Sequence, residues 1–204
     1  MTFYQYGYEI VRSALPPEVI KYIVISAKIE ETANLFFRPS TSQQPFPFND
    51  PTSYQSYSSY SAIYVESLLI YLKPIMEKIT GKTLEPTYTY YRHYFNKAVL
   101  AKHTDRPSCE YSATICLDKD ADWPIYYELA DKTTVEVNLA PGDMAIYKGC
   151  ELPHWRNQYE GVSHLQAFIH YVDFNGQYGK DFRYDQRPVL GVQKNDRATK
   201  TIML

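Results

Sequence analysis

Residues 100–118 have the sequence LAKHTDRPSCEYSATICLD. The fold prediction starts from this stretch, because a candidate metal-binding pair in it is followed directly by a β-type run. His103 and Asp105 are two residues apart, and side chains at positions i and i+2 near a strand end point the same way. A non-haem Fe(II) site needs two imidazoles and one carboxylate on one face of the metal. The pair supplies two of these ligands. A bare HxD is a weak pattern, so the surrounding sequence has to support it.

Short β-type runs flank the pair on both sides. The aromatic run TYTYYRHY precedes it, and EYSATICLD, TTVEVNLA, DMAIYK and HLQAFIHYVD follow it. A turn signal, Pro141-Gly142-Asp143, separates two of these runs, and His154 comes after the second. We therefore take His154 as the natural third ligand, supplied by a distant strand.

The N-terminal part of the chain has a different pattern. Pro16-Pro17-Glu18 reads as a helix start, and the run that follows is apolar at helical spacing. Residues 38–61 are rich in Pro, Ser, Gln and Tyr without periodicity, which predicts a long loop, either a lid over the substrate or an exposed, mobile segment. A second helix follows over 61–80, kinked at Pro74 and closed by Gly81. Helices followed by many short strands predict an α+β, mainly β fold, with N-terminal helices packed on one sheet of a jelly roll.

Composition excludes several classes of function. The 204 residues are 45% hydrophobic and 22% charged, as in ordinary globular proteins. A net charge of −2 gives no electrostatic reason to expect nucleic acid or an anionic membrane as a partner. No apolar run approaches the length of a membrane span. Three cysteines without CxxC spacing predict a reducing, cytoplasmic location. Nothing in the composition indicates an oligomeric state.

Residues 90–173 resemble the catalytic core of the 2-oxoglutarate- and Fe(II)-dependent oxygenases, of the prolyl-hydroxylase-like type. The motifs that carry the resemblance are Tyr94, the HxD pair with the strand after it, Trp123, the Pro-Gly-Asp turn, His154 and SHLQAFIHYVD. The resemblance implies a double-stranded β-helix, a jelly-roll variant, with His103, Asp105 and His154 as iron ligands. The pattern along the chain divides one oxygenase domain, 1–204, into a mainly helical support (1–83), a jelly-roll catalytic core (84–174) and a polar, irregular tail (175–204).

The same resemblance implies a reaction. Its cofactors are Fe(II) and 2-oxoglutarate, its co-reactant is O2, and a peptide residue or small molecule is hydroxylated with release of succinate and CO2. Asp105 indicates a hydroxylase rather than a halogenase-like relative, in which a small residue at this position leaves room for halide.

One position departs from the family pattern. The family holds the distal carboxylate of 2-oxoglutarate with an arginine or lysine about ten residues after the distal histidine, and here that position is His164. His164 could do this itself with help from Thr114, although it lacks the bidentate fork of arginine. Arg92 or Arg156 could take over, or the cosubstrate could be another molecule. We keep all three alternatives.

Alternation along the strands ranks these candidates. If Tyr94 faces the barrel interior, as its family counterpart does, Arg92 shares that face, and so do the following residues: Tyr90, Ser112, Thr114, Cys116, His164, Gln166, Phe168 and His170. An arginine there needs a partner, which is a dicarboxylate or a glutamate such as Glu110 or Glu128. Arg92 is thus the leading alternative anchor, while Arg156 could meet the 1-carboxylate or the substrate.

Other residues are candidates for substrate contact. Arg106 could reach a substrate carboxylate or form a salt bridge, and Trp155 could line the mouth of the site or pack. Tyr57 lies in the predicted lid together with Tyr54 and Tyr60. For Trp123 we expect plain packing, and for His170 a satisfied core or rim position.

Two rival functions remain open. A cupin-type metal enzyme would share the His/Asp/His cluster without using 2-oxoglutarate. A non-catalytic jelly-roll binding module would use its tyrosines to hold sugar or peptide and would bind no iron.

Overall fold

The long strand β3 (Leu84–His103) organises the fold because it takes part in both layers of one curled sheet. Its first part pairs antiparallel with β9 (Ser163–Asp173), and its end pairs with β8 (His154–Arg156). Lys97 has a φ of 66° in the stretch between these two pairings. With this change of partner, the end of β3 passes from one layer of the sheet to the other. The computed structural model describes residues 2–36 and 53–192.

The remaining strands complete a nine-stranded sheet in the order β1-β7-β4-β9-β3-β8-β5-β6, with β2 also paired to β3. Their bounds are β1 (Tyr8–Val11), β2 (Ser53–Tyr60), β4 (Tyr111–Lys119), β5 (Ile125–Glu128), β6 (Thr134–Val137) and β7 (Met144–Lys148). The helices are α1 (Thr2–Tyr6), α2 (Pro17–Phe36), α3 (Ile63–Tyr71), α4 (Lys73–Thr80) and α5 (Gly179–Phe182). Short 3-10 turns lie at Pro107–Cys109 and Arg183–Gln186. No helix in these ranges is both long enough and apolar enough to cross a bilayer.

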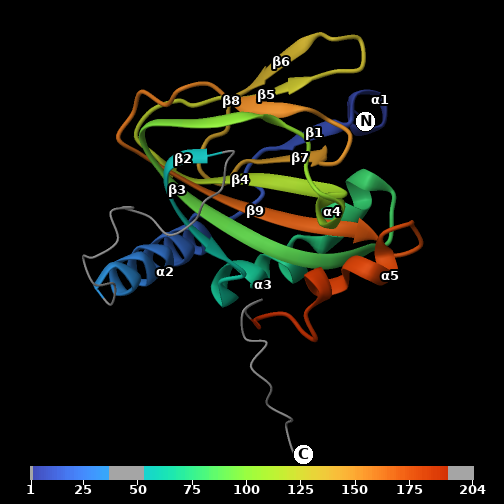
Figure 1. Ribbon diagram of the computed structural model, residues 1–204, viewed down its shortest axis with the longest axis horizontal. Coiled ribbons are helices and arrows are strands. Elements are labelled where there is room, and N and C mark those ends of the chain that lie inside the picture. The colour runs from blue at the N-terminus through green and yellow to red at the C-terminus, as the bar shows by residue number, and fades with distance from the viewer. Residues whose placement is uncertain (1, 37–52, 193–204) are drawn as a thin grey trace, which may run out of the picture.

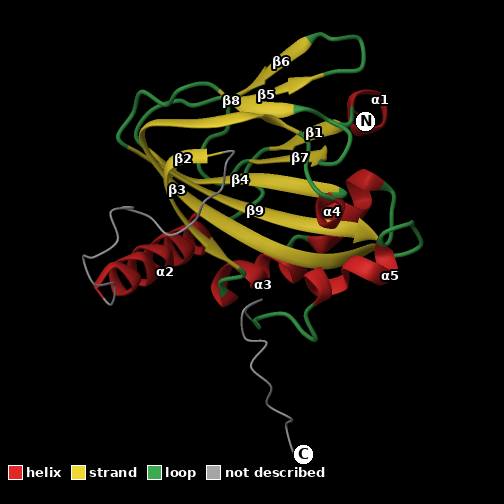
Figure 2. Cartoon of the chain, in the orientation of Figure 1, coloured by secondary structure: helices red, strands yellow, loops and turns green. Residues whose placement is uncertain are grey.

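The strands curl into two facing layers (Figures 1 and 2). Strands β8, β5 and β6 form the smaller layer at the top, and α2 and α3 lie on the opposite side of the larger layer (Figure 1). This is the expected jelly roll with N-terminal helices packed on one sheet.

Alternation along β9 separates two cores. The side chains of Leu165, Ala167, Ile169 and Tyr171 belong to the cluster that packs against α2, α3 and α4. Residues at the even positions between them face the space between the two layers, where a second cluster joins β4, β5 and β7. The inward set predicted from alternation therefore faces the interior, and this interior holds the candidate site.

Two predictions about the N-terminal half need correction. Residues 53–60 of the expected loop form strand β2, whereas 38–52 lie outside the described residues. A register irregularity between Tyr54 and Ser56, with Gln55 at a φ of 55°, breaks the alternation that marks a strand in sequence. The expected kink at Pro74 is a full break, because Leu72 separates α3 from α4. Gly81 closes α4 in the left-handed conformation, as expected.

The tail is more ordered than its polar composition indicates. From residue 175 we expected irregular structure, but α5 and the turn Arg183–Gln186 lie there. Tyr184, Asp185 and Gln186 all have left-handed φ values, of 50°, 54° and 65°. Non-glycine residues hold such conformations only where surrounding contacts enforce them.

Candidate active site

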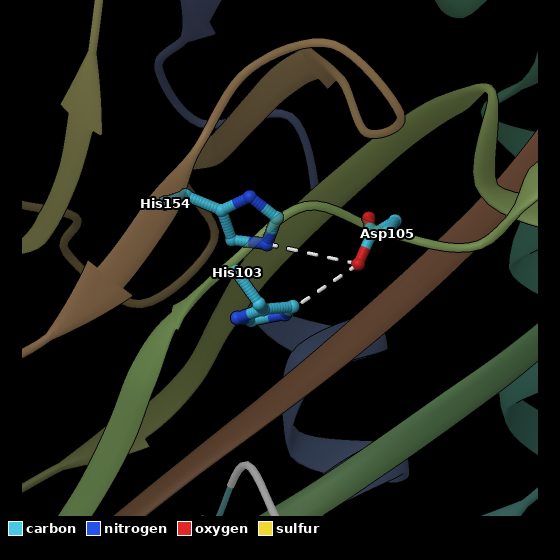
Figure 3. A group of neighbouring side chains, drawn as sticks. All are labelled: His103, Asp105 and His154. Carbon is cyan, nitrogen blue, oxygen red and sulfur yellow. Dashed lines mark ion pairs between the residues drawn. The ribbon is translucent and has the colours of Figure 1, made fainter.

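The three predicted ligands converge at one end of the interior (Figure 3). His103 ends β3 and His154 begins β8, and the two residues are directly paired across the strands. Their ring centroids are 4.3 Å apart. Nε2 of His103 and Nε2 of His154 lie 3.6 and 3.7 Å from Oδ1 of Asp105. All three donor atoms lie within 4.8 Å of one another, so one metal ion can contact all of them.

Hydrogen bonds fix which nitrogen of each imidazole faces this centre. Nδ1 of His103 is 2.7 Å from the carbonyl oxygen of Ala101, and Nδ1 of His154 is 3.0 Å from that of Leu152. A carbonyl oxygen only accepts, so each Nδ1 carries the hydrogen and each Nε2 keeps its lone pair. Metal-binding histidines are oriented by second hydrogen bonds of this kind. The pair is thus prepared to bind a metal before the metal arrives.

Asp105 is held from two sides. Its backbone N–H donates to the carbonyl oxygen of Gly149 at 2.8 Å, and Ser112 donates its hydroxyl to Oδ2 at 3.1 Å. Burial alone would raise the pKa of Asp105, but the neighbouring imidazoles of His103, His154 and His170 together lower it. The carboxylate is therefore ionised, as a metal ligand must be.

A second group of possible ligands shares Asp105 with Cys109 and His170. Burial raises the pKa of Cys109 well above its usual range, and its sulfur is 3.1 Å from the hydroxyl of Tyr88. Nδ1 of His170 is hydrogen-bonded to Ser112 at 2.8 Å. A protonated thiol is a poor ligand, so the His103–Asp105–His154 group is the better metal site.

The metal group opens onto a cavity of about 350 Å³. Ligand sites for small molecules have volumes of this order. The wall is largely aromatic, and its aromatic members other than histidine are Tyr60, Tyr88, Tyr90, Tyr94, Tyr147 and Phe168. Three of them, Tyr90, Tyr94 and Phe168, were predicted from strand alternation to face the interior. Tyr88 is on the same face of β3 as Tyr90 and Tyr94. Tyr60 and Tyr147 come from strands that the sequence did not connect to the site.

Arg106 also lines the cavity, but its charge is already paired. Its Nη1 and Nη2 donate to Oδ1 and Oδ2 of Asp185 at 2.7 and 2.9 Å. Asp185 is 1% exposed and also accepts from Ser108 at 2.8 Å and from Tyr60 at 2.6 Å. Of the two readings of Arg106, the structure therefore shows the salt bridge rather than a free charge for substrate. Asp185 thus holds Arg106 and Tyr60, two residues of the cavity wall, and no sequence motif indicated this role.

We expect Asp185→Asn to weaken both the fold and the metal site. An amide brings two new N–H donors to a buried position that already faces donors from three residues, which should lower the free energy of unfolding by about 1–3 kcal/mol. Because Arg106 follows Asp105 directly, Co(II) affinity should fall by about 10-fold, as for other residues that support metal ligands. Urea unfolding and Co(II) titration measure the two effects. Arg183→Gln, which removes an exposed ion pair with Glu85 in the same segment, should change neither appreciably. Unchanged Co(II) affinity in Asp185→Asn would refute the link to the metal site.

The three candidate anchors occupy different places. Arg92 lies on the cavity wall with its guanidinium 5.0 Å from the ring centroid of Tyr90. The glutamates considered as its partners are engaged elsewhere, Glu110 with the backbone N–H of Asp173 and Glu128 with two lysines. Arg156 and His164 are deeper, only 2% and 1% exposed.

Arg156 and His164 share an aromatic neighbour and have unused donors. The guanidinium carbon of Arg156 is 4.9 Å from the ring centroid of Trp123, and the His164 ring is 5.4 Å from it. Nη1 of Arg156 donates to the carbonyl oxygen of Trp123, while its Nε and Nη2 have no hydrogen-bond partner among the described residues. Nε2 of His164 lies 2.8 Å from the side-chain nitrogen of Gln166, whose oxygen accepts from Thr114 at 3.1 Å. Trp123 packs, as expected, and the side chains it packs against include Arg156 and His164.

Two predicted substrate contacts lie away from the cavity. Trp155 points to the face of β8 opposite His154, where it stacks on Tyr126 with ring centroids 5.6 Å apart. Tyr57 is 2% exposed and accepts a hydrogen bond of 2.6 Å from Asn34 on α2. Tyr57 belongs to the core beneath the sheet, because β2 is a strand whose alternate residues face the helices. The role predicted for Tyr57 is therefore corrected, and Tyr60 of the same strand reaches the cavity instead.

No protein-family model matches this chain, and no curated protein matches it. Solved structures do match. A Pseudomonas putida prolyl-4-hydroxylase has a TM-score of 0.67 at 15% identity, over 84% of this chain and 95% of the other. HygX from Streptomyces hygroscopicus, with nickel, 2-oxoglutarate and hygromycin B bound, has a TM-score of 0.61 at 12% identity, over 85% of each chain.

A third match is the non-heme alpha ketoglutarate dependent carbocyclase SnoK from nogalamycin biosynthesis. Its TM-score is 0.65 at 13% identity, over 91% of this chain and 85% of the other. At these identities the likeness establishes the fold. The chain has the fold of the 2-oxoglutarate- and Fe(II)-dependent oxygenases of the prolyl-hydroxylase-like type, which confirms the fold expected from sequence.

Proposed function

We propose that this chain is a non-haem Fe(II)- and 2-oxoglutarate-dependent oxygenase that hydroxylates a small molecule or a peptide residue. The observation that carries the proposal is the orientation of His103 and His154, whose Nε2 atoms face an ionised Asp105 beside a cavity. Two neutral imidazoles and one carboxylate suit Fe(II) and leave further coordination positions for other ligands.

The proposed reaction divides the work between cofactors and protein. Bound Fe(II) and 2-oxoglutarate supply the oxidation, in which one oxygen atom of O2 enters a substrate C–H bond as hydroxyl, the other enters succinate, and CO2 leaves. The chain holds the metal through His103, Asp105 and His154. Aromatic side chains of β2, β3, β7 and β9 form much of the wall of the cavity beside these ligands.

The size of the cavity supports a small molecule or a single side chain as substrate. Hydroxylation is the proposed outcome because Asp105 occupies the position that a halogenase-like relative leaves to halide. We also propose a reducing, cytoplasmic location, which the three free cysteines support.

A turnover assay without added substrate tests this function. With Fe(II), ascorbate, 2-oxoglutarate and O2, we expect slow uncoupled formation of succinate, measured by NMR, and its loss in Asp105→Ala. Tightly bound metal without any succinate would favour the cupin-type enzyme. A protein that binds no metal would favour the binding module.

A further inference from the structure

We infer that the distal carboxylate of 2-oxoglutarate is anchored by Arg156 on β8, with His164 and Tyr94 as neutral hydrogen-bond donors. The family pattern places this cation about ten residues after the distal histidine, whereas Arg156 is on the strand of that histidine, two residues after His154. This inference rests on the proposed function.

The first observation is that Arg156 is a buried cation with unused donors. It is 2% exposed, and no carboxylate of the described residues forms an ion pair with it. Burial lowers the pKa of Arg156, but a guanidinium remains charged in proteins. A buried charge with two open N–H edges is costly unless an anion pairs with it. The position therefore calls for a ligand with negative charge.

The second observation is that His164 cannot supply that charge. Burial, and then the charge of Arg156, lower the pKa of His164 to about 2, so its imidazole is neutral. Thr114 donates to the side-chain oxygen of Gln166, so the Gln166 nitrogen donates to Nε2 of His164. The hydrogen of His164 is then on Nδ1, which is buried and has no hydrogen-bond partner among the described residues. His164 offers one neutral donor rather than a cation.

The third observation is that these donors meet around Trp123. The Trp123 ring lies 4.8 Å from the ring of Tyr94, 4.9 Å from the guanidinium carbon of Arg156 and 5.4 Å from the ring of His164. The hydroxyl of Tyr94 is also buried without a hydrogen-bond partner in the described part of the chain. Four unused donor atoms of three residues thus belong to one cluster. A carboxylate, with two oxygens and about four lone-pair sites, matches this cluster.

The cluster reaches the cavity of the metal ligands through Tyr94. His154 and Arg156 point to the same face of β8, and Tyr94 lines the cavity that contains the metal ligands. A molecule that contacts the metal through one end and the cluster through the other needs two anionic groups. The dicarboxylate 2-oxoglutarate has this chemistry. Arg106, by contrast, is neutralised by Asp185.

Binding measurements on the Co(II)-loaded protein, without turnover, test the inference. The probes are 2-oxoglutarate and 2-oxopentanoate, which has the same chain length but no distal carboxylate. By calorimetry, the unsubstituted protein should prefer 2-oxoglutarate by 10- to 100-fold, about what charge-assisted hydrogen bonds contribute. Arg156→Gln should lose most of this preference and keep its affinity for Co(II) and 2-oxopentanoate.

A compensating variant makes the test specific to the location of the charge. In Arg156→Gln, the further change His164→Arg puts a cation at the position of the family pattern, and we expect it to restore at least part of the preference. Arg92→Gln is the comparison, since Arg92 is the candidate anchor that lines the cavity itself. Arg156→Gln should fold, because it removes an unpaired buried charge, and thermal unfolding checks this.

The outcomes separate the two proposals. A Co(II)-loaded protein that shows no preference for 2-oxoglutarate contradicts the proposed function itself. A clear preference that survives in Arg156→Gln overturns only the anchor. Loss of the preference in Arg92→Gln, with Arg156→Gln unaffected, would assign the anchor to Arg92.

Discussion

Replacing His154 by alanine should abolish turnover and remove tight metal binding while leaving the fold largely intact. The imidazole supplies one of three ligands, and its Nε2 has no other hydrogen-bond role in the described structure. Loss of a ligand should weaken Co(II) binding by more than the roughly 10- to 100-fold that loss of a supporting hydrogen bond costs. Co(II) titration by visible absorbance measures the change, and circular dichroism reports on the fold.

His93→Gln is the matched control for this variant. His93 lies on the same strand as His103 but pairs with Glu31 on α2, at 2.8 Å, on the other face of the sheet. Its replacement should leave Co(II) affinity within about twofold, since metal affinity depends on ligands and the residues that touch them. Equal metal affinity in His154→Ala and His93→Gln would contradict the assignment of the ligands.

The largest effect on stability is expected for Arg187→Met. Arg187 and Glu66 form an ion pair whose side chains are 2% and 3% exposed, and it joins the C-terminal segment to α3. The guanidinium also donates to the carbonyl oxygens of Tyr184, Thr87 and Val192. Removing it leaves the Glu66 carboxylate buried without its counter-charge, which should lower the free energy of unfolding by about 3–5 kcal/mol. That is a large share of the roughly 5–15 kcal/mol typical of a domain.

Urea unfolding of a double-mutant cycle separates this charge effect from lost packing. Glu66→Leu combined with Arg187→Met removes both charges, so the double variant should be clearly more stable than the sum of the single effects predicts. Additive effects, or a loss below about 1 kcal/mol in Arg187→Met, would show that the pair contributes little.

The sequence predicted the metal site because its signal is local. Spacing of two residues places His103 and Asp105 on one side of a strand end, and a Pro-Gly turn before His154 brings a second strand back. The inward face of β9 was predicted for the same reason, since a period of two is fixed by the backbone. These features do not depend on which distant residues surround them.

The remaining parts of the site depend on contacts that no local pattern records. Asp185 reaches Arg106 across 79 positions of sequence, from a strained turn in a polar tail. The choice among Arg92, Arg156 and His164 depends on burial and on unused donors, which only the packed interior shows. The sequence predicts a loop where β2 lies, because the segment is rich in Ser and Tyr and a register irregularity interrupts the alternation typical of a strand.

The most direct test of the central claim is an anaerobic titration of the Fe(II)-loaded protein with 2-oxoglutarate. A 2-oxo acid that chelates Fe(II) held by two histidines and a carboxylate gives a visible metal-to-ligand charge-transfer band. We predict that the band appears, saturates at one equivalent per chain, and is absent in His154→Ala. Bound iron with no band at saturating 2-oxoglutarate would contradict the claim that this chain is a 2-oxoglutarate-dependent oxygenase.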